Sequence, residues 1–319
     1  MDSFDIPEDF YETLNEKYEQ AVKNNHILFN GDAAVNELVK VKASELTIDF
    51  QLTLLTSLAH KPEQGDRESN PFEKPEPELT ILNNYGPNKE FRVVFNKFPV
   101  VPLHFLLVTK EFQSQNSPLS PAELFASYKI LSKVVEKSKR NNSEWFAFFN
   151  CGPESGASQP HKHIQFMIQP PPSMQFKPYA ETLALQAETV SAKSKPFQSN
   201  NLPFAHFLIK LPDESHVDEN VLATSFTALL QRTLTVLRSN EQKQISYNFI
   251  MTPSYMLMVP RATAKYEGKL GINSCGFQGL ILCKNEELFE MVKQKGPLDI
   301  LRAVGFPNTT DIPEDEYHY

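Results

Sequence analysis

The sequence is poor in cysteine, glycine and tryptophan, and it has no excess of positive charge. Its 319 residues include three cysteines, 11 glycines and one tryptophan. Three cysteines without a Cys-x-x-Cys spacing support neither a disulfide framework nor a cysteine-based zinc site. With 31 Lys and Arg against 39 Asp and Glu, the formal net charge is −8. This charge disfavours a general nucleic-acid binder, because such proteins need a basic surplus to neutralise phosphates.

Long apolar runs are also missing. No stretch approaches the roughly 20 apolar residues that a membrane-spanning helix needs. The first residues, MDSFDIPEDFYE, carry neither the cationic start nor the apolar stretch of a secretory signal. We therefore expect a soluble protein of the cytoplasm, with the nucleus as a second location, that binds neither membranes nor nucleic acid. A mass of 36.3 kDa is sufficient for a large core, in one domain or in two joined halves.

Helical and strand patterns alternate along the chain. Apolar residues that recur every three to four positions predict helices at 8–24, 120–139, 218–238 and 285–295. Short β-branched and aromatic runs predict strands at 91–95, 104–109, 145–149, 161–168, 206–211, 246–250, 255–259 and 279–283. Clusters of strands separated by helices indicate an α+β fold with a mixed, mainly antiparallel sheet flanked by helices, because a parallel barrel would need more crossover helices.

Two stretches rich in proline and polar residues interrupt this pattern. Residues 61–78 are charged and have few apolar side chains, and residues 169–203 begin with QPPPS. We interpret both as loops. The second would join an N-terminal half, residues 1–168, to a C-terminal half, residues 204–319, and the two halves are expected to form one compact unit.

One stretch, NCGPESGASQPHKHIQ at residues 150–165, stands apart as a carrier of chemistry. Successive side chains of a strand alternate between its faces, so His161, His163 and Gln165 are predicted to project from one face. The preceding turn, rich in Gly and Ser, brings backbone N–H groups that can form an anion-binding nest. A phosphate-binding turn that leads into two histidines predicts attack on phosphorus by a neutral imidazole, whose unperturbed pKa is about 6.5.

Plainer interpretations of the same residues stay open. A His-x-His pair on a strand also occurs as a metal pair in zinc hydrolases, although no third ligand at a suitable spacing is evident. The pair can be purely structural, and a turn rich in Gly and Ser is ordinary in most proteins. The turn and the histidines together are far more specific than either alone. We predict no metal site built from the protein and no organic cofactor.

The segment GPESGASQPHKHIQF (152–166) is similar to the active-site segment of the fungal diadenosine tetraphosphate phosphorylases, in the transferase branch of the histidine-triad superfamily. The resemblance covers nearly the whole chain, with FNKFPVVPLHFLLVTKEF (95–112), SPLSPAEL (117–124) and INSCGFQGLILCKNEE (272–287) in the expected order. It implies a histidine-triad-like fold and the reversible cleavage of diadenosine tetraphosphate by inorganic phosphate to ADP and ATP, through AMP bound covalently to a histidine. It also allows an exchange of phosphate or sulfate on ADP.

The resemblance further implies which residues form the site. The first histidine of the motif, His161, is expected to be the nucleophile, while His163 donates to phosphoryl or leaving oxygens and Gln165 donates to the AMP phosphate. The hydrolases of the superfamily have a third histidine where this chain has Gln, which favours transfer to phosphate over transfer to water. The residues expected to bind substrate are Asn96, Lys97, Lys61, Asn150, Glu154, Ser155, Gly156, Ala157, Ser158, Asn273, Ser274 and Lys284.

The implied partners are a small dinucleotide polyphosphate and inorganic phosphate, and the chain is expected to be a monomer or a homodimer. A divalent cation, Mg²⁺ or similar, would enter with the polyphosphate rather than in a protein cage. Two other functions stay open. A uridylyltransferase-like enzyme would act on a sugar phosphate, but such enzymes usually have HPHxQ, whereas Lys162 replaces the Pro here. A non-catalytic dinucleotide sensor would need the phosphate turn but not two aligned histidines.

Overall fold

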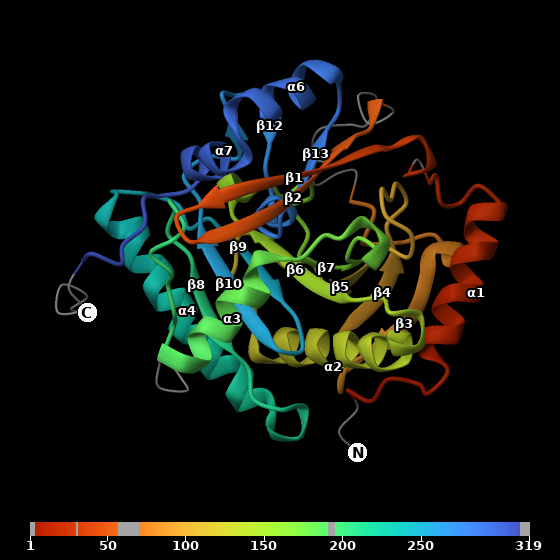
Figure 1. Ribbon diagram of the computed structural model, residues 1–319. Coiled ribbons are helices and arrows are strands. Elements are labelled where there is room, and N and C mark those ends of the chain that lie inside the picture. The colour runs from red at the N-terminus through yellow and green to blue at the C-terminus, as the bar shows by residue number, and fades with distance from the viewer. Residues whose placement is uncertain (1–3, 30, 57–69, 191–194, 313–319) are drawn as a thin grey trace.

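The central feature of the computed structural model is an eight-stranded antiparallel sheet with the strand order β3-β4-β5-β7-β6-β9-β10-β8 (Figure 1). The structure describes residues 4–29, 31–56, 70–190 and 195–312. The strands are β3 (Thr80–Tyr85), β4 (Phe91–Phe95), β5 (Phe105–Thr109), β6 (Trp145–Cys151), β7 (His163–Ile168), β8 (Phe207–Lys210), β9 (Tyr247–Met251) and β10 (Tyr255–Pro260).

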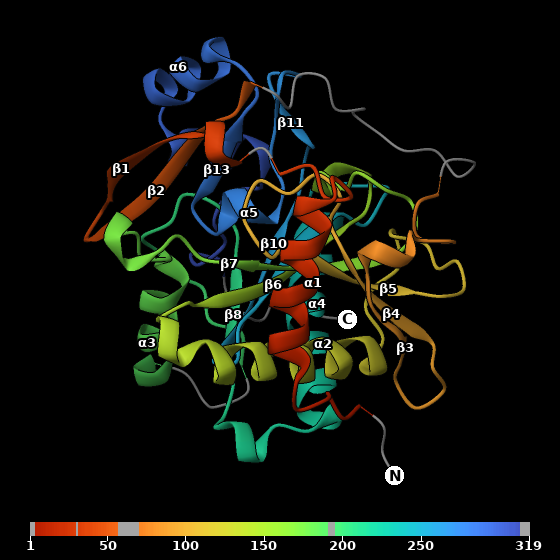
Figure 2. The same ribbon diagram turned by 90° about the vertical axis from the view of Figure 1, so that its right-hand side faces the viewer.

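Two long helices, α2 (Pro121–Ser138) and α4 (Glu219–Ser239), cover one face of the sheet and pack against each other (Figures 1 and 2). The predicted start of α2 is confirmed, because the Ser120 hydroxyl accepts from the Glu123 N–H and the Glu123 carboxylate accepts from the Ser120 N–H. The helix α1 (Phe10–Lys23) packs against β3 and α2 at the edge of the sheet.

The opposite face carries a second, three-stranded sheet with the order β1-β2-β13. The hairpin β1 (Val35–Ala43) and β2 (Leu46–Leu54) is N-terminal, whereas β13 (Leu280–Cys283) pairs with β2 from the far end of the chain. The helices α5 (Ser274–Phe277), α6 (Glu286–Lys295) and α7 (Pro297–Val304) and the short strands β11 (Lys265–Tyr266) and β12 (Leu270–Gly271) complete this layer. An apolar cluster fills the space between the two sheets.

The structure confirms the four predicted helices and all eight predicted strands, within a few residues at their ends. The interpretation of residues 169–203 as a loop is wrong in its middle. A helix, α3 (Tyr179–Val190), lies there and buries Tyr179, Ala180, Leu183 and Ala187. These residues have helical spacing, which the proline-rich and polar flanks outweighed. Strands β1, β2 and β3 were missed because polar residues interleave with their apolar ones.

The main sheet contains two units with the same chain topology, strand-helix-strand-strand. The units β5-α2-β6-β7 and β8-α4-β9-β10 meet where β6 pairs with β9, and the strand order around this pair is the same from either side. Only the first unit carries a histidine, His163, on its last strand. The corresponding strand β10 is YMLMVP and is fully buried, so it contributes no polar side chain of this kind. Within the described ranges, no helix is long and apolar enough to cross a membrane.

Candidate active site

A cavity of about 1220 Å³ lies between the N-terminal part of the main sheet and the β1-β2-β13 sheet. Most of the residues predicted from the sequence meet there, although they come from distant elements. Its lining includes ten of them: Asn96, Lys97, Asn150, Gly156, Ala157, Ser158, His163, Gln165, Asn273 and Lys284. Four others do not line it, namely Glu154, Ser155, His161 and Ser274, and Lys61 lies outside the described residues.

The first residue of β7, His163, presents its ring to the cavity. Its Nδ1 lies 2.8 Å from the carbonyl oxygen of His161, and since a carbonyl can only accept, Nδ1 carries the proton and Nε2 has a free lone pair. Among the residues that the structure describes, none bonds this Nε2. Burial, reinforced by the charge of His161, lowers the pKa of His163 to about 4 despite that hydrogen bond. The ring is therefore neutral at physiological pH, as a nucleophile requires.

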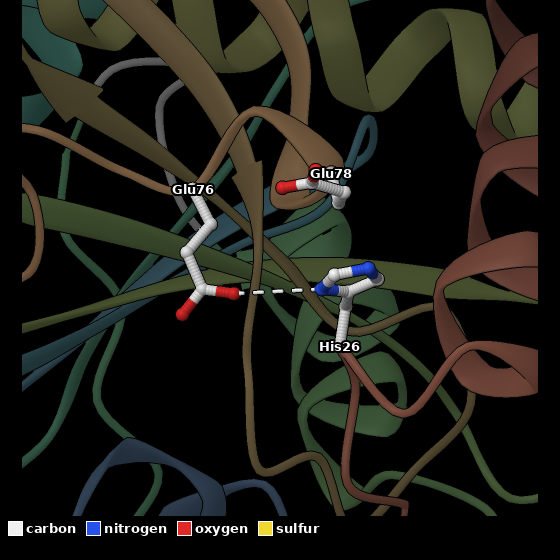
Figure 3. A group of neighbouring side chains, drawn as sticks. All are labelled: His26, Glu76 and Glu78. Carbon is white, nitrogen blue, oxygen red and sulfur yellow. Dashed lines mark ion pairs between the residues drawn. The ribbon is translucent and has the colours of Figure 1, made fainter.

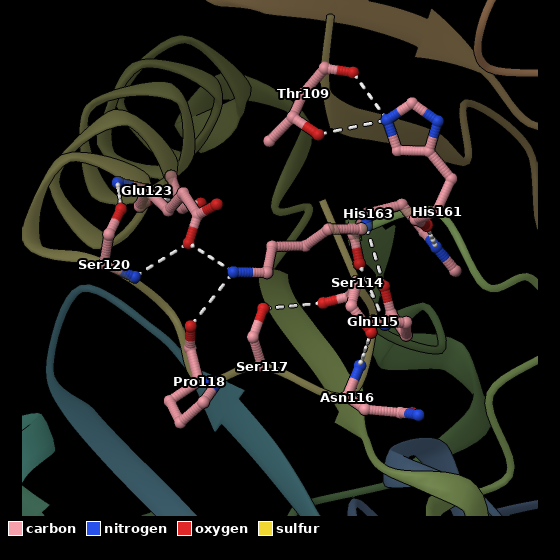
Figure 4. A network of polar contacts seen from close by, with 12 residues as sticks. Thr109, Ser114, Gln115, Asn116, Ser117, Pro118, Ser120, Glu123, His161 and His163 are labelled. Carbon is pink, nitrogen blue, oxygen red and sulfur yellow. Dashed lines mark hydrogen bonds and ion pairs between the residues drawn. The ribbon is translucent and has the colours of Figure 1, made fainter. Parts of the chain in front are cut away.

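The backbone at His163 is held by a residue that the sequence did not suggest. The buried Gln115 accepts a hydrogen bond from the His163 N–H at 2.8 Å (Figure 4). It also donates to the Asn150 carbonyl at 2.8 Å. One carboxamide thus joins the start of β7 to the end of β6. Gln115 lies in a loop with no distinctive pattern, so no local signal could have marked it.

The ring of His161 points toward Thr109 (Figure 4), and His161 does not line the cavity. Its Nε2 lies 2.8 Å from the Thr109 carbonyl, and Asn70 Nδ2 lies 2.9 Å from its Nδ1. Both nitrogens are therefore occupied. Burial lowers the pKa of His161, so this ring too favours the neutral form. The prediction that His161 is the nucleophile is not supported, because its side chain does not reach the cavity.

The position between the histidines has a structural role. Lys162 is buried, and its Nζ lies 3.1 Å from a Glu123 carboxylate oxygen and 3.0 Å from the Pro118 carbonyl. Glu123 also belongs to the capping box of α2. These contacts attach the start of β7 to the start of α2. Because successive side chains of an extended chain point to opposite sides, His163 lies on the cavity side when Lys162 points to α2.

The carboxamide of Gln165 is oriented by a chain of two further residues. The His104 Nε2 donates to Gln165 Oε1 at 3.0 Å, and Asn96 Nδ2 donates to His104 Nδ1 at 3.1 Å. Since a carboxamide oxygen accepts and its nitrogen donates, this chain leaves the Gln165 NH₂ group to donate into the cavity. Asn96 therefore belongs to the site through His104, which also lines the cavity.

The Gly/Ser turn divides into a buried part and a part that faces the cavity. Ser155 is fully buried and donates its hydroxyl to the Gly152 carbonyl at 2.6 Å. Glu154 accepts from the Ala264 N–H at 2.9 Å. These two side chains are satisfied by backbone groups and do not meet the cavity. By contrast, Gly156 and the two residues after it line the cavity, and no described residue accepts a hydrogen bond from the backbone N–H of these three.

The side chain of Asn150 is partly committed to the fold. Its Oδ1 accepts from Asn248 Nδ2 at 2.8 Å and from the backbone N–H and hydroxyl of Ser274 at 2.9 and 2.7 Å. Ser274 is thus structural rather than a cavity ligand. Asn150 lines the cavity, so its Nδ2 is the donor that can serve a substrate.

The rim of the cavity carries side chains of both positive and negative charge. Lys97 pairs with Glu76 at 2.5 Å, and His26 Nδ1 lies 3.8 Å from the same carboxylate. Figure 3 shows His26, Glu76 and Glu78, whose potential ligand atoms lie within 4.8 Å of one another. Glu76 is already paired with Lys97, so we assign this group to the rim and not to a metal. The sequence did not indicate the further cavity lysines, Lys74, Lys265 and Lys269.

Comparison with known proteins identifies the family. The family model described as Ap4A phosphorylase N-terminal domain matches residues 7–184, which is more than half of the chain. A second model, the ATP adenylyltransferase C-terminal domain, matches residues 200–307. The chain belongs to the Ap4A phosphorylase family. Members of this family are nucleotidyltransferases, so the predicted enzyme class is confirmed.

Relatives in this family match the chain from end to end. Protein APA1 and diadenosine 5',5'''-P1,P4-tetraphosphate phosphorylase 2, both of Saccharomyces cerevisiae, are each 35% identical over 98% of this chain and over 99% and 100% of their own. The crystal structure of yeast Ap4A phosphorylase Apa2 superposes with a TM-score of 0.82, at 34% identity over 99% of this chain and 100% of its own. Its complex with AMP gives 0.81, at 33% identity over 97% and 100%. This likeness confirms the predicted fold class.

The lowered pKa of His163 leads to an expected dependence of the reaction rate on pH. Because the pKa of His163 is about 4, a step that needs its neutral ring should keep its rate as the pH falls through about 6.5 and lose it only near pH 4. Single-turnover release of ATP from Ap4A measures this step without the titration of phosphate. A fall in rate centred near pH 6.5 would show that the group that titrates in this step does not have the lowered pKa of His163.

The same shift links protonation to stability. The ring takes up a proton near pH 6.5 in the unfolded chain but only near pH 4 in the folded chain. Between these values the unfolded chain binds more protons, so the free energy of unfolding should fall as the pH is lowered. The buried His206, whose pKa burial also lowers to about 4, adds to the same slope. Urea denaturation at several pH values measures it.

Proposed function

We propose that this protein cleaves Ap4A with inorganic phosphate to give ADP and ATP, and that AMP is held on His163 between the two steps. Among the predicted site residues, this ring combines a place in the cavity lining with an unprotonated nitrogen that no described residue occupies. This single observation carries the proposal. The likeness of the chain to yeast Ap4A phosphorylase Apa2, one structure of which is a complex with Ap4A, supports the choice of substrate.

The two displacements balance around His163. Its Nε2 lone pair attacks the α-phosphorus, the N–P bond forms, and the P–O bond to the leaving ATP breaks. A phosphate oxygen then attacks the same phosphorus, and the N–P electron pair returns to the ring as ADP leaves. Two moderate barriers replace one high barrier. The same intermediate would accept sulfate on its phosphorus, as an oxyanion of similar shape.

The other polar groups of the cavity would hold the oxygens of the reacting phosphate. The Gln165 NH₂ group, the Asn150 Nδ2 and the free N–H groups of the 156–158 turn all donate hydrogen bonds, which stabilises charge as it develops. Gln165 cannot exchange a proton with the acceptor. Such a site suits inorganic phosphate, which arrives already ionised, better than water, which must lose a proton during attack.

His161 would act indirectly, as a positioning residue. Asn70, which bonds its ring, also accepts the N–H of Phe72, and the Phe72 ring lies 5.9 Å from the ring of His161 and 5.2 Å from that of His163. Arg92 donates to the Phe72 carbonyl at 3.3 Å. Residues 70–72 are therefore held beside the nucleophile, where Phe72 shields one side of its ring from water.

Dependence on phosphate tests this function. Mg²⁺ is included because it enters with the polyphosphate. With Ap4A and Mg²⁺ but no phosphate, the protein should release one equivalent of ATP per active site and then stop, because the AMP on the enzyme has no acceptor. Added phosphate should restore turnover, with radioactive phosphate appearing in ADP. Continuous formation of AMP without phosphate would show a hydrolase. If ATP never appears, the chain is not a transferase of this kind, and binding without turnover would favour a sensor.

A further inference from the structure

A buried arginine lies behind the Gly/Ser turn without a carboxylate in direct contact. Arg261 follows β10, is 0% exposed and donates only to neutral oxygens. Its Nη1 contacts the carbonyls of Ser155 and Ile272 at 3.3 and 2.8 Å, and Nη2 contacts that of Thr263 at 2.7 Å. Further bonds reach Asn248 and Val304. Among the described residues, no carboxylate forms an ion pair with it, and the charge of Glu154 acts on the guanidinium only from a longer distance, although a buried charge normally requires a direct partner.

Two of these carbonyls fix the direction of the N–H groups that follow them. In a trans peptide the C=O and the next N–H point in opposite directions, and the structure contains no cis peptide bond within the described residues. Since the Ser155 and Ile272 carbonyls point to Arg261, the N–H groups of Gly156 and Asn273 point away from it. Both residues line the cavity, and neither N–H has an acceptor in the described part of the chain.

The two residues that carry these N–H groups come from opposite halves of the chain but are neighbours in space. A Cβ atom built on Gly156 would lie 2.5 Å from the Ile272 carbonyl oxygen and 3.1 Å from Asn273 Cβ. Gly156 also has a φ of +80°, which only glycine adopts readily. The close approach therefore depends on glycine at this position. Two adjacent donors in front of a buried positive charge make a site for one anionic group.

We propose that Arg261 is a positioning residue that aims the N–H groups of Gly156 and Asn273 at one phosphate of the dinucleotide, and that this phosphate balances the buried guanidinium charge. The inference rests on the proposed function, because it supplies the polyphosphate. It assigns to the C-terminal half a definite part in binding: Asn273 acts through its backbone, and Arg261 acts from below the cavity without touching the substrate.

The ratio of two affinities tests the role of Arg261 independently of catalysis. In a His163→Asn background, which should bind Ap4A without cleaving it, Arg261→Gln should weaken the binding of Ap4A by about ten- to a hundredfold and leave the binding of adenosine, which has no phosphate, unchanged. Arg261→Lys, which keeps the charge but loses the fork of donors, should fall in between. Partial unfolding would lower the apparent affinity for both ligands equally, so the ratio isolates the phosphate. An unchanged ratio in Arg261→Gln would overturn the proposal while leaving phosphorolysis possible.

The wild-type protein provides a test that does not depend on any variant folding. Inorganic tripolyphosphate, added to protein labelled with ¹⁵N, should move the amide proton signals of Gly156 and Asn273 strongly downfield, as expected for new hydrogen bonds to an anion. The amide of Gly268, which lies outside the cavity lining, serves as the control. If tripolyphosphate binds and the two signals stay in place, the anion site is elsewhere. If the wild-type protein fails to release ATP from Ap4A, the proposed function itself fails.

Discussion

Replacing His163 with alanine is expected to lower the rate of Ap4A phosphorolysis by about a thousandfold or more, because the nitrogen that bonds to phosphorus is removed. The His163→Asn variant should lose turnover to the same extent while it still binds Ap4A, since most of the cavity lining is unchanged. Single-turnover release of ATP and calorimetric binding of Ap4A measure the two effects. Wild-type rates in either variant would remove His163 from the mechanism.

The neighbouring histidine provides the matched control for this prediction. His161→Ala removes an equally buried imidazole, two residues before His163 in the chain, but leaves the nitrogen of His163 in the cavity. Its rate should fall by about ten- to a hundredfold, the usual range for a supporting contact. Mass spectrometry of acid-labile adducts trapped without phosphate should find AMP on residue 163 in both wild-type and His161→Ala protein. An adduct on His161 would overturn the assignment.

A methyl group at Gly156 is expected to damage both stability and binding. Gly156→Ala forces a residue with a Cβ into a φ of +80° and places that atom 2.5 Å from the Ile272 carbonyl oxygen. The backbone must shift, and the N–H groups aimed at the phosphate shift with it. We expect a loss of about 2–4 kcal/mol in the free energy of unfolding and a fall of about a hundredfold in kcat/KM.

A control substitution at a second glycine distinguishes the effect of the steric clash from that of the backbone strain. Gly268 has a similar φ of +69°, but a Cβ built there meets nothing within 4 Å. Gly268→Ala should therefore lose only about 1 kcal/mol of stability and keep its kcat/KM. Urea denaturation and steady-state kinetics on both variants measure the difference. Equal losses in the two variants would show that close packing at Gly156 is unimportant.

Much of the fold could be predicted because its signals are local. The capping box at Ser120, the apolar periodicity of the four helices and the strand-length runs each depend on residues within one or two turns of one another. The pairing of β2 with β13 could not be predicted in this way, since residues near positions 52 and 281 meet only in the folded chain. The helix α3 was missed although its signal is local, because the composition of its flanks was given more weight than its apolar periodicity.

The candidate site likewise has features that local sequence patterns predict and features that depend on long-range contacts. By itself, the sequence determined that two histidines and Gln165 follow a glycine-containing turn, because alternation along a strand and the freedom of Gly156 are properties of the local chain. Only the tertiary structure decided that His163 meets the cavity while His161 turns to Thr109 and Asn70. It alone placed Arg261 beneath a turn that lies 106 residues earlier. The direction of a side chain at the end of a strand depends on which distant groups satisfy its hydrogen bonds, and short-range patterns carry no information about those groups.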